Sequence, residues 1–228
     1  MNIAKPRVLV IAEAANPDWV SVPLVGWNIA SALRSVADAH IVTQIRNRAS
    51  FLSRGLVEGR DFTAIDSEAF AAPFYQIAER LRGGDGKGWT TITALQSLAY
   101  PYFEHLVWRR FGNAIKAGQY DVVHRVTPLS PTAPSSLARR CRSAGIPFLL
   151  GPLNGGLPWH AEYGRERIKE REWLSYIRKA YSYLPSIRST YRNAAAIIAG
   201  SRHTMGELSR YGRPMIYVPE NGIDTDRF

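Results

Sequence analysis

Short, almost wholly apolar runs, separated by segments of helical periodicity, constrain the fold of this chain most strongly. The first run, Arg7–Ala12, has no polar residue after Arg7, and such a run is typical of a parallel strand buried on both faces. Residues 24–36 then space their apolar side chains as a helix does, and residues 39–43 give a second strand. The same patterns predict further strands at 61–65, 120–124, 147–150, 194–199 and 214–218, and helices at 70–81, 92–117, 134–144, 165–192 in one or two pieces, and 202–211.

Strands that alternate with helices predict a mostly parallel sheet with helices on both faces and right-handed crossovers. The expected fold class is therefore α/β, a Rossmann-like, doubly wound domain. Ligands of such domains bind beyond the carboxyl ends of the strands. The residues that follow each predicted strand are the ones in which to look for a functional site.

Two common nucleotide-binding motifs are absent. The segment after the first strand, 13–21, contains no Gly-x-Gly-x-x-Gly, the motif that lets a backbone approach a dinucleotide pyrophosphate closely. The chain also lacks a Walker Gly-x-x-x-x-Gly-Lys-Ser/Thr motif. An NAD-dependent dehydrogenase and a P-loop phosphotransferase are therefore disfavoured.

Composition indicates a globular protein of the cytoplasm. The apolar content of 46% and the charged content of 21% are ordinary. The longest apolar runs are far shorter than a bilayer span, and the amino-terminal residues lack the apolar region of a secretory signal. A single cysteine, Cys141, excludes an internal disulfide and a cysteine-cluster metal site.

The net charge of +10 is concentrated in part of the chain, since residues 121–180 carry ten basic and five acidic side chains. No nucleic-acid reader motif accompanies this charge, so nucleic acid is not an expected partner. Residues 165–192 place apolar side chains at intervals of three and four between basic ones. One interpretation is a helix whose apolar stripe packs on the domain. The other is attachment of the protein to the anionic inner face of a membrane.

Candidate binding residues follow two of the predicted strands. His124 is expected to end its strand, where it and Arg125 would meet a sugar hydroxyl or a phosphate, and Thr127 follows. The alternative for His124 is a hydrogen bond at the rim of the sheet. Residues 151–156, which end in Asn154, Gly155 and Gly156, are expected to form a loop whose amides approach a ligand. The alternative there is a plain tight turn.

Five motifs in order carry a family resemblance. They are Tyr-Asp-Val-Val-His at 120–124, Thr-Pro at 127–128, Gly-Ile-Pro-Phe at 145–148, Gly-Pro-x-x-Gly-Gly at 151–156 and Pro-Glu-Asn-Gly-Ile-Asp at 219–224. Together they resemble the N-terminal, acceptor-side half of a retaining family 4 glycosyltransferase of the GT-B fold. The last motif, taken alone, also suits a terminal strand followed by an Asn-Gly turn.

The resemblance implies an enzyme of the hexosyltransferase type. It would transfer a sugar from an activated, nucleotide-linked donor to the hydroxyl of a sugar or lipid-linked acceptor, as in surface polysaccharide or glycolipid synthesis, without a metal or other cofactor. Residues 1–218 would be the acceptor-side domain, and 219–228 the crossover to a missing donor-binding domain, without which the fragment would be inactive. Glu220, Asn221 and Gly222 would lie on the donor side. The alternative function is a non-catalytic module that binds a glycan or a lipid.

Overall fold

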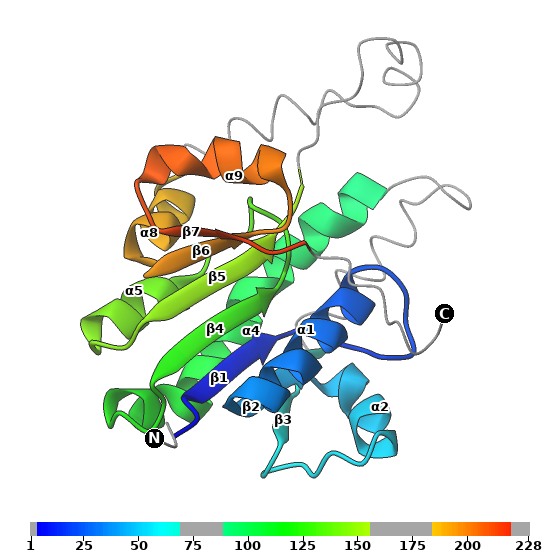
Figure 1. The fold of residues 1–228 in the computed structure, drawn as a ribbon. Helices are drawn as coiled ribbons and strands as arrows, with labels where there is room; N and C mark the ends of the chain where they lie inside the picture. The colour runs from blue at the N-terminus through cyan, green and yellow to red at the C-terminus, as the bar shows by residue number, and fades with distance from the viewer. Residues whose placement is uncertain (1–3, 69–88, 156–183, 220–228) are drawn as a thin grey trace.

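One parallel sheet forms the centre of the molecule (Figure 1). The computed structural model describes residues 4–68, 89–155 and 184–219, and within these ranges seven strands pair in the order β3-β2-β1-β4-β5-β6-β7. The expected doubly wound α/β fold is confirmed. The strands are β1 (Arg7–Ala12), β2 (Asp38–Gln44), β3 (Phe62–Ile65), β4 (Val122–Thr127), β5 (Phe148–Leu153), β6 (Ala196–Ala199) and β7 (Met215–Tyr217).

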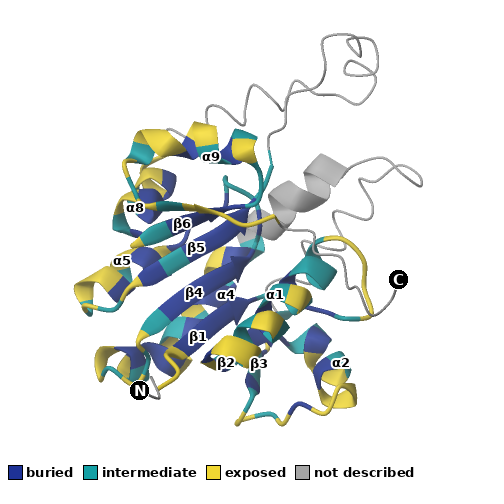
Figure 2. Ribbon diagram, viewed as in Figure 1, coloured by how far each residue is buried: buried dark blue, intermediate teal, exposed yellow. Residues whose placement is uncertain are grey.

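Helices cover both faces of the sheet. On one face, α1 and α2 pack through Trp27 and Phe51, whose rings meet edge to face with centroids 4.9 Å apart. On the other face, α4, α5, α8 and α9 enclose the larger core. The central strands between the two layers are buried, whereas β7 at the edge of the sheet is largely exposed (Figure 2). The described helices are α1 (Val22–Val36), η1 (Ile45–Asn47), α2 (Arg48–Ser53), α4 (Trp89–Lys116), α5 (Ser136–Ser143), α8 (Pro185–Asn193), α9 (Arg202–Leu208) and η3 (Ser209–Tyr211).

The strand order contains one switch point, between β1 and β4. From β1 the chain moves outward through β2 to β3, then returns beside β1 as β4 and continues in the opposite direction. The connections that leave the carboxyl ends of β1 and β4 therefore diverge to opposite faces of the sheet. A crevice at such a divergence is the usual place for a ligand in an open α/β sheet.

A buried polar seam joins the helices of the larger layer. Glu104 of α4 is 1% exposed, and its carboxylate accepts hydrogen bonds from the hydroxyl of Ser135, from the backbone N–H of Ser136 at 2.7 Å and from the hydroxyl of Ser136 at 3.0 Å. The backbone N–H of Ser135 donates in turn to Thr190 Oγ1 of α8 at 2.7 Å. One carboxylate thus connects α4 to the start of α5, and the same segment is tied to α8.

Cys141 lies on the inner side of α5 and is fully buried. Burial, with a smaller contribution from the Glu104 carboxylate, raises the pKa of the Cys141 thiol to about 12. A thiol of that kind stays protonated and acts as a small apolar side chain. Cys141 is therefore a packing residue.

Two predicted strand ends are wrong. β4 was expected to stop at His124 but continues to Thr127, and β5 was expected to give way to a loop at Gly151 but continues to Leu153. Both strands extend because the polar residues and the glycine that suggested an end are themselves buried in the sheet. The short helices η1 and α2 were not predicted at all.

The predicted helix at 70–81 and most of the segment 165–192 lie outside the described residues. None of the helices in the described part of the chain combines the length and the apolar character that a bilayer span requires.

Candidate functional site

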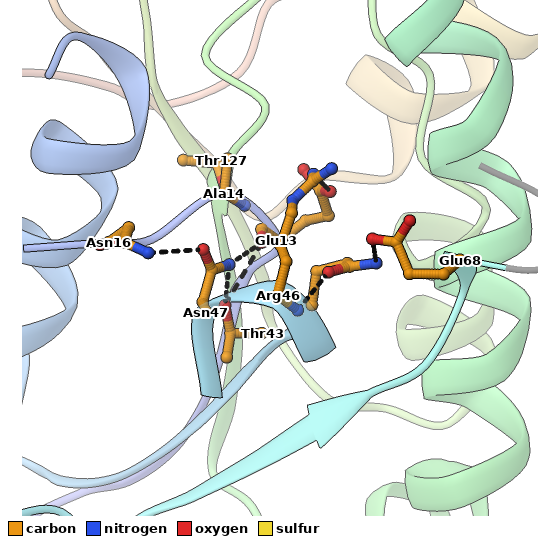
Figure 3. Close-up of polar contacts among 9 residues, drawn as sticks. Glu13, Ala14, Asn16, Thr43, Arg46, Asn47, Glu68 and Thr127 are labelled. Atoms are coloured by element: carbon orange, nitrogen blue, oxygen red, sulfur yellow. Dashed lines mark hydrogen bonds and ion pairs between the residues drawn. The ribbon is translucent and has the colours of Figure 1, made fainter. Parts of the chain in front are cut away.

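Polar side chains at or just after the ends of four strands gather at the carboxyl edge of the sheet, beside the switch point (Figure 3). Glu13 follows β1 directly, and Thr127 is the last residue of β4. Arg46 belongs to η1, immediately after β2, and Glu68 follows β3. We call this set of residues the edge cluster.

An ion pair between Glu13 and Arg46 is the centre of the edge cluster. The two side chains are 18% and 21% exposed, so each is mostly covered and still reaches solvent. Burial raises the pKa of Glu13, the nearby Glu68 carboxylate raises it further, and Arg46 opposes both effects by charge and by a hydrogen bond. The pair offers carboxylate oxygens that accept hydrogen bonds from hydroxyl groups, next to a guanidinium that donates them.

Amide side chains fix the backbone that carries Glu13. Asn47 donates through Nδ2 to the backbone oxygen of Glu13 at 2.9 Å and to Thr43 Oγ1 at 2.9 Å. Its side-chain oxygen accepts from Asn16 Nδ2 at 3.2 Å, and Asn16 in turn accepts from the backbone N–H of Asp18 at 2.9 Å. Asn16 and Asn47 are almost fully buried. A satisfied buried network of this kind holds the connection after β1 in one conformation.

The same connection is held from the side of α1 and β4. The backbone N–H of Ala14 donates to Thr127 Oγ1 at 3.0 Å. A Cβ atom on Gly26 of α1 would collide with the backbone oxygen of Ala14 and would lie 2.9 Å from Thr127 Cγ2. Only glycine permits this close approach of helix and backbone. Thr127 thus positions the connection rather than facing a ligand, since it is fully buried.

His124 and Arg125 lie inside the molecule, which corrects their predicted place at the strand end. His124 is 3% exposed and donates from Nε2 to the backbone oxygen of Gly151 at 2.7 Å. Arg125 is fully buried, donates to the backbone oxygen of Ala133 at 2.8 Å and lies over the ring of Tyr100 at 5.6 Å. Both side chains face protein atoms, and neither is open to a ligand in this structure. His124 is hydrogen-bonded, as its alternative interpretation expected, but inside the sheet rather than at its rim.

The remaining predicted residues follow β5 or end the chain. Asn154 donates its backbone N–H to the oxygen of Leu129 at 2.9 Å, and Gly155 has a φ of 148° that favours glycine. Both are partly exposed just past the carboxyl edge, on the β5 side of the switch point. Gly156, Glu220, Asn221 and Gly222 lie outside the described residues.

Three functional candidates were missed from the sequence: Glu13, Arg46 and Asn47. Glu13 carried a usable signal, because it is the first charged residue after a strand that the apolar pattern located correctly. Arg46 and Asn47 lie in a short helix without a detectable period, so no pattern placed them next to Glu13. Among the described residues, no three His, Cys, Asp or Glu side chains gather in a way that suits a metal ion.

Stability should depend on pH through His124. Burial lowers the pKa of His124 to about 4, and the hydrogen bond to Gly151 opposes this only in part. The unfolded chain therefore binds the proton more readily than the folded chain between pH 6.5 and 4, and stability falls as the pH falls through that window. Between pH 7.5 and 5 we expect this residue to remove about 2 kcal/mol from the free energy of unfolding.

Urea titrations of the wild type and of His124→Gln across this range test the effect. Glutamine keeps a donor for the Gly151 oxygen but does not titrate, so its stability should change less with pH than that of the wild type. His40→Gln is the matched control, because the His40 ring is less deeply buried and its pKa is lowered by burial to a smaller extent. Equal pH slopes for the wild type and His124→Gln would contradict the prediction.

Comparison with known proteins assigns the chain to a family. A search of curated proteins found no match. The family model Glycosyltransferase Family 4 matches residues 70–227, which is more than half of the chain and includes β4 to β7 with the connections between them. The parallel, doubly wound sheet agrees with the N-terminal domain of a GT-B glycosyltransferase. The chain belongs to Glycosyltransferase Family 4.

Proposed function

We propose that the edge cluster binds the acceptor of a retaining glycosyltransferase. In this proposal a hydroxyl of the acceptor, a sugar or a lipid-linked sugar, donates a hydrogen bond to Glu13. Arg46 lowers the pKa of Glu13, which favours its ionised form, and donates to an oxygen of the same ligand. The donor, a nucleotide sugar, would be held by a second domain that faces this edge, and no metal would take part.

The ion pair at the switch point carries the proposal. It lies where ligands of parallel α/β sheets bind, and it is only partly exposed, so its hydrogen bonds are less weakened by water than those of a surface pair. Family membership supports glycosyl transfer as the type of reaction. Sugar hydroxyls are both donors and acceptors, and a carboxylate beside a guanidinium satisfies both roles.

An activity measurement on the whole gene product tests the proposal. The protein would be incubated with a panel of nucleotide sugars, with and without lipid-linked acceptors, and both transfer and donor hydrolysis would be followed. A protein that neither binds nor consumes an activated sugar would exclude the enzymatic function. Binding without turnover would favour a glycan-binding module instead.

Once an activity is found, Glu13→Gln and Arg46→Ala should each lower kcat/KM for the acceptor about 10- to 100-fold. Arg46→Ala should also move the acidic limb of the pH profile to higher pH, because Arg46 lowers the pKa of Glu13. Glu13→Gln should abolish that limb. A residue that only supported the fold would lower activity without moving the limb.

The ion pair between Arg54 and Asp18 provides the matched control. It joins the connection after β1 to the end of α2 at 2.9 Å, and both side chains are more than 40% exposed. Asp18→Asn and Arg54→Ala remove the same charges from the same part of the chain and should leave kcat/KM within about twofold. Equal losses in the two pairs would exclude a specific role for the edge cluster.

Attachment to an anionic membrane surface also remains a proposal. The segment 165–192 that suggests it lies for the most part outside the described residues. A lipid-linked acceptor would be consistent with such attachment, and co-sedimentation with anionic vesicles at low salt tests it.

A further inference from the structure

The larger helical layer contains a groove that the edge cluster does not explain. It lies between the C-terminal half of α4 and α5 and has a volume of about 330 Å³. Its lining consists of Trp108, Lys116, Arg139, Arg140, Ser143 and Ala144. We call it the α4–α5 groove. Because α4 leads from the end of β3 to the beginning of β4, its C-terminal half lies toward the amino edge of the sheet, away from the edge cluster.

Cationic groups converge on one indole ring in this groove. The Lys116 ammonium lies 5.5 Å from the centre of the Trp108 ring, and the Arg140 guanidinium lies 5.1 Å from it. Contacts of this kind attract a cationic group to the face of the ring and so restrict where the long side chain lies. The Trp108 ring also packs closely against its own helix, since a Cβ on Gly112 would lie 3.0 Å from the Cε2 atom of the ring. The two cations are therefore held at the groove.

No carboxylate of the described residues forms an ion pair with these cations. In the part of the chain that the structure describes, the ion pairs of arginine all involve residues from Arg7 to Arg60, and none involves α4 or α5. The sequence of α5 holds three arginines and no acidic residue. The only acidic residue of α4, Glu104, is buried and bonded to Ser135 and Ser136. The groove thus presents several positive charges together.

Stabilisation of the carboxyl-terminal ends of α4 and α5 explains the presence of only some of these cations. Cations in the last turn of a helix stabilise its exposed carbonyl groups, and Lys116 and Arg140 occupy such positions. Arg139 does not, yet it lines the same groove. Its guanidinium donates to no carboxylate in the described ranges.

We propose that the α4–α5 groove binds a phosphate group. Guanidinium and ammonium groups are the side chains that bind phosphate in proteins, arginine by paired N–H donors and lysine as a point charge. Ser143 adds a hydroxyl at the wall of the groove. The phosphate could belong to a lipid headgroup or to a phosphorylated molecule in solution, since both present the same oxygens.

Inorganic phosphate and vesicles are the probes for the 228-residue chain. Binding of phosphate would be measured by calorimetry, and binding of vesicles of phosphatidylglycerol and of phosphatidylcholine by co-sedimentation. The groove variant is Lys116→Glu with Arg139→Glu. The control is Lys5→Glu with Arg110→Glu, which reverses two charges at exposed residues that do not line the groove. Circular dichroism would verify that both variants fold.

We expect the wild type and the control to bind phosphate alike, and the groove variant to bind it at least about tenfold more weakly. If phosphatidylglycerol vesicles show the same loss and phosphate competes with them, the phosphate belongs to a lipid headgroup. If vesicles do not bind, or bind the groove variant and the control alike, the ligand is a phosphorylated molecule in solution. Absence of phosphate binding to the wild type, or an equal loss in the groove variant and the control, overturns the proposal.

Discussion

Replacement of Glu104 by alanine is expected to lower the free energy of unfolding by about 3 to 5 kcal/mol. The substitution removes a buried carboxylate and leaves three donors of Ser135 and Ser136 without their acceptor. It also removes a negative charge from the neighbourhood of Tyr100, whose pKa responds to both Glu104 and the fully buried Arg125. Urea unfolding followed by circular dichroism measures the loss.

Glu104→Gln separates charge from hydrogen bonding at this position, and Glu207→Ala is an exposed control. Glu104→Gln keeps the shape and one acceptor, so it should lose less than Glu104→Ala. Glu207→Ala removes the same side chain from an exposed position on α9, and should change the free energy of unfolding by no more than about 0.5 kcal/mol. Equal effects at 104 and 207 would mean that the buried seam does not hold α4 and α5 together.

Replacement of Gly151 by alanine is expected to cost about 3 to 5 kcal/mol, from steric overlap and backbone strain together. Gly151 has a φ of 121°, which L side chains rarely adopt. A Cβ there would overlap the backbone oxygen of Ile198 and lie 2.8 Å from the backbone nitrogen of Leu153. Backbone atoms of β5 and β6 cannot move apart without loss of their pairing. In thermal unfolding we expect the midpoint to fall by about 10 °C.

Gly145→Ala is the control for this effect. Gly145 also has a positive φ, of 74°, but nothing lies within 4 Å of a Cβ at that position. The control therefore carries the conformational cost alone, about 1 kcal/mol. If Gly151→Ala were no less stable than Gly145→Ala, the close approach of β5 and β6 at this point would be wrong.

The fold could be predicted from the sequence because apolar runs and helical periods follow directly from burial. Every strand of the described sheet was located by its apolar residues. The strand ends at β4 and β5 were misplaced because His124, Arg125 and Gly151 are residue types that usually mark a surface or a turn. Here His124 and Arg125 are buried and each donates a hydrogen bond to a backbone oxygen inside the molecule, and only tertiary structure can show that.

For the candidate site, the sequence predicted a location but not the residues of the edge cluster. The rule that ligands bind beyond the carboxyl ends of parallel strands pointed to the edge of the sheet at which the edge cluster lies. It did not select Glu13 and Arg46, which are 33 residues apart in the chain and meet only when β1 and β2 pair. The short helix that carries Arg46 is fixed by Gln44, whose side chain accepts from the backbone N–H of Arg46 at 2.7 Å, and no pattern of apolar residues announces it.

The contact at Gly26 limits how this family member can diversify. Because α1 touches the segment that carries Glu13 without any intervening side chain, a bulkier residue at position 26 would displace that segment as a whole. New ligand preferences are more accessible through the described parts of the connections after β2 and β5, where no glycine lies against a backbone oxygen as Gly26 does. Evolutionary change in ligand preference should therefore accumulate in those two connections, while the connection after β1 stays unchanged.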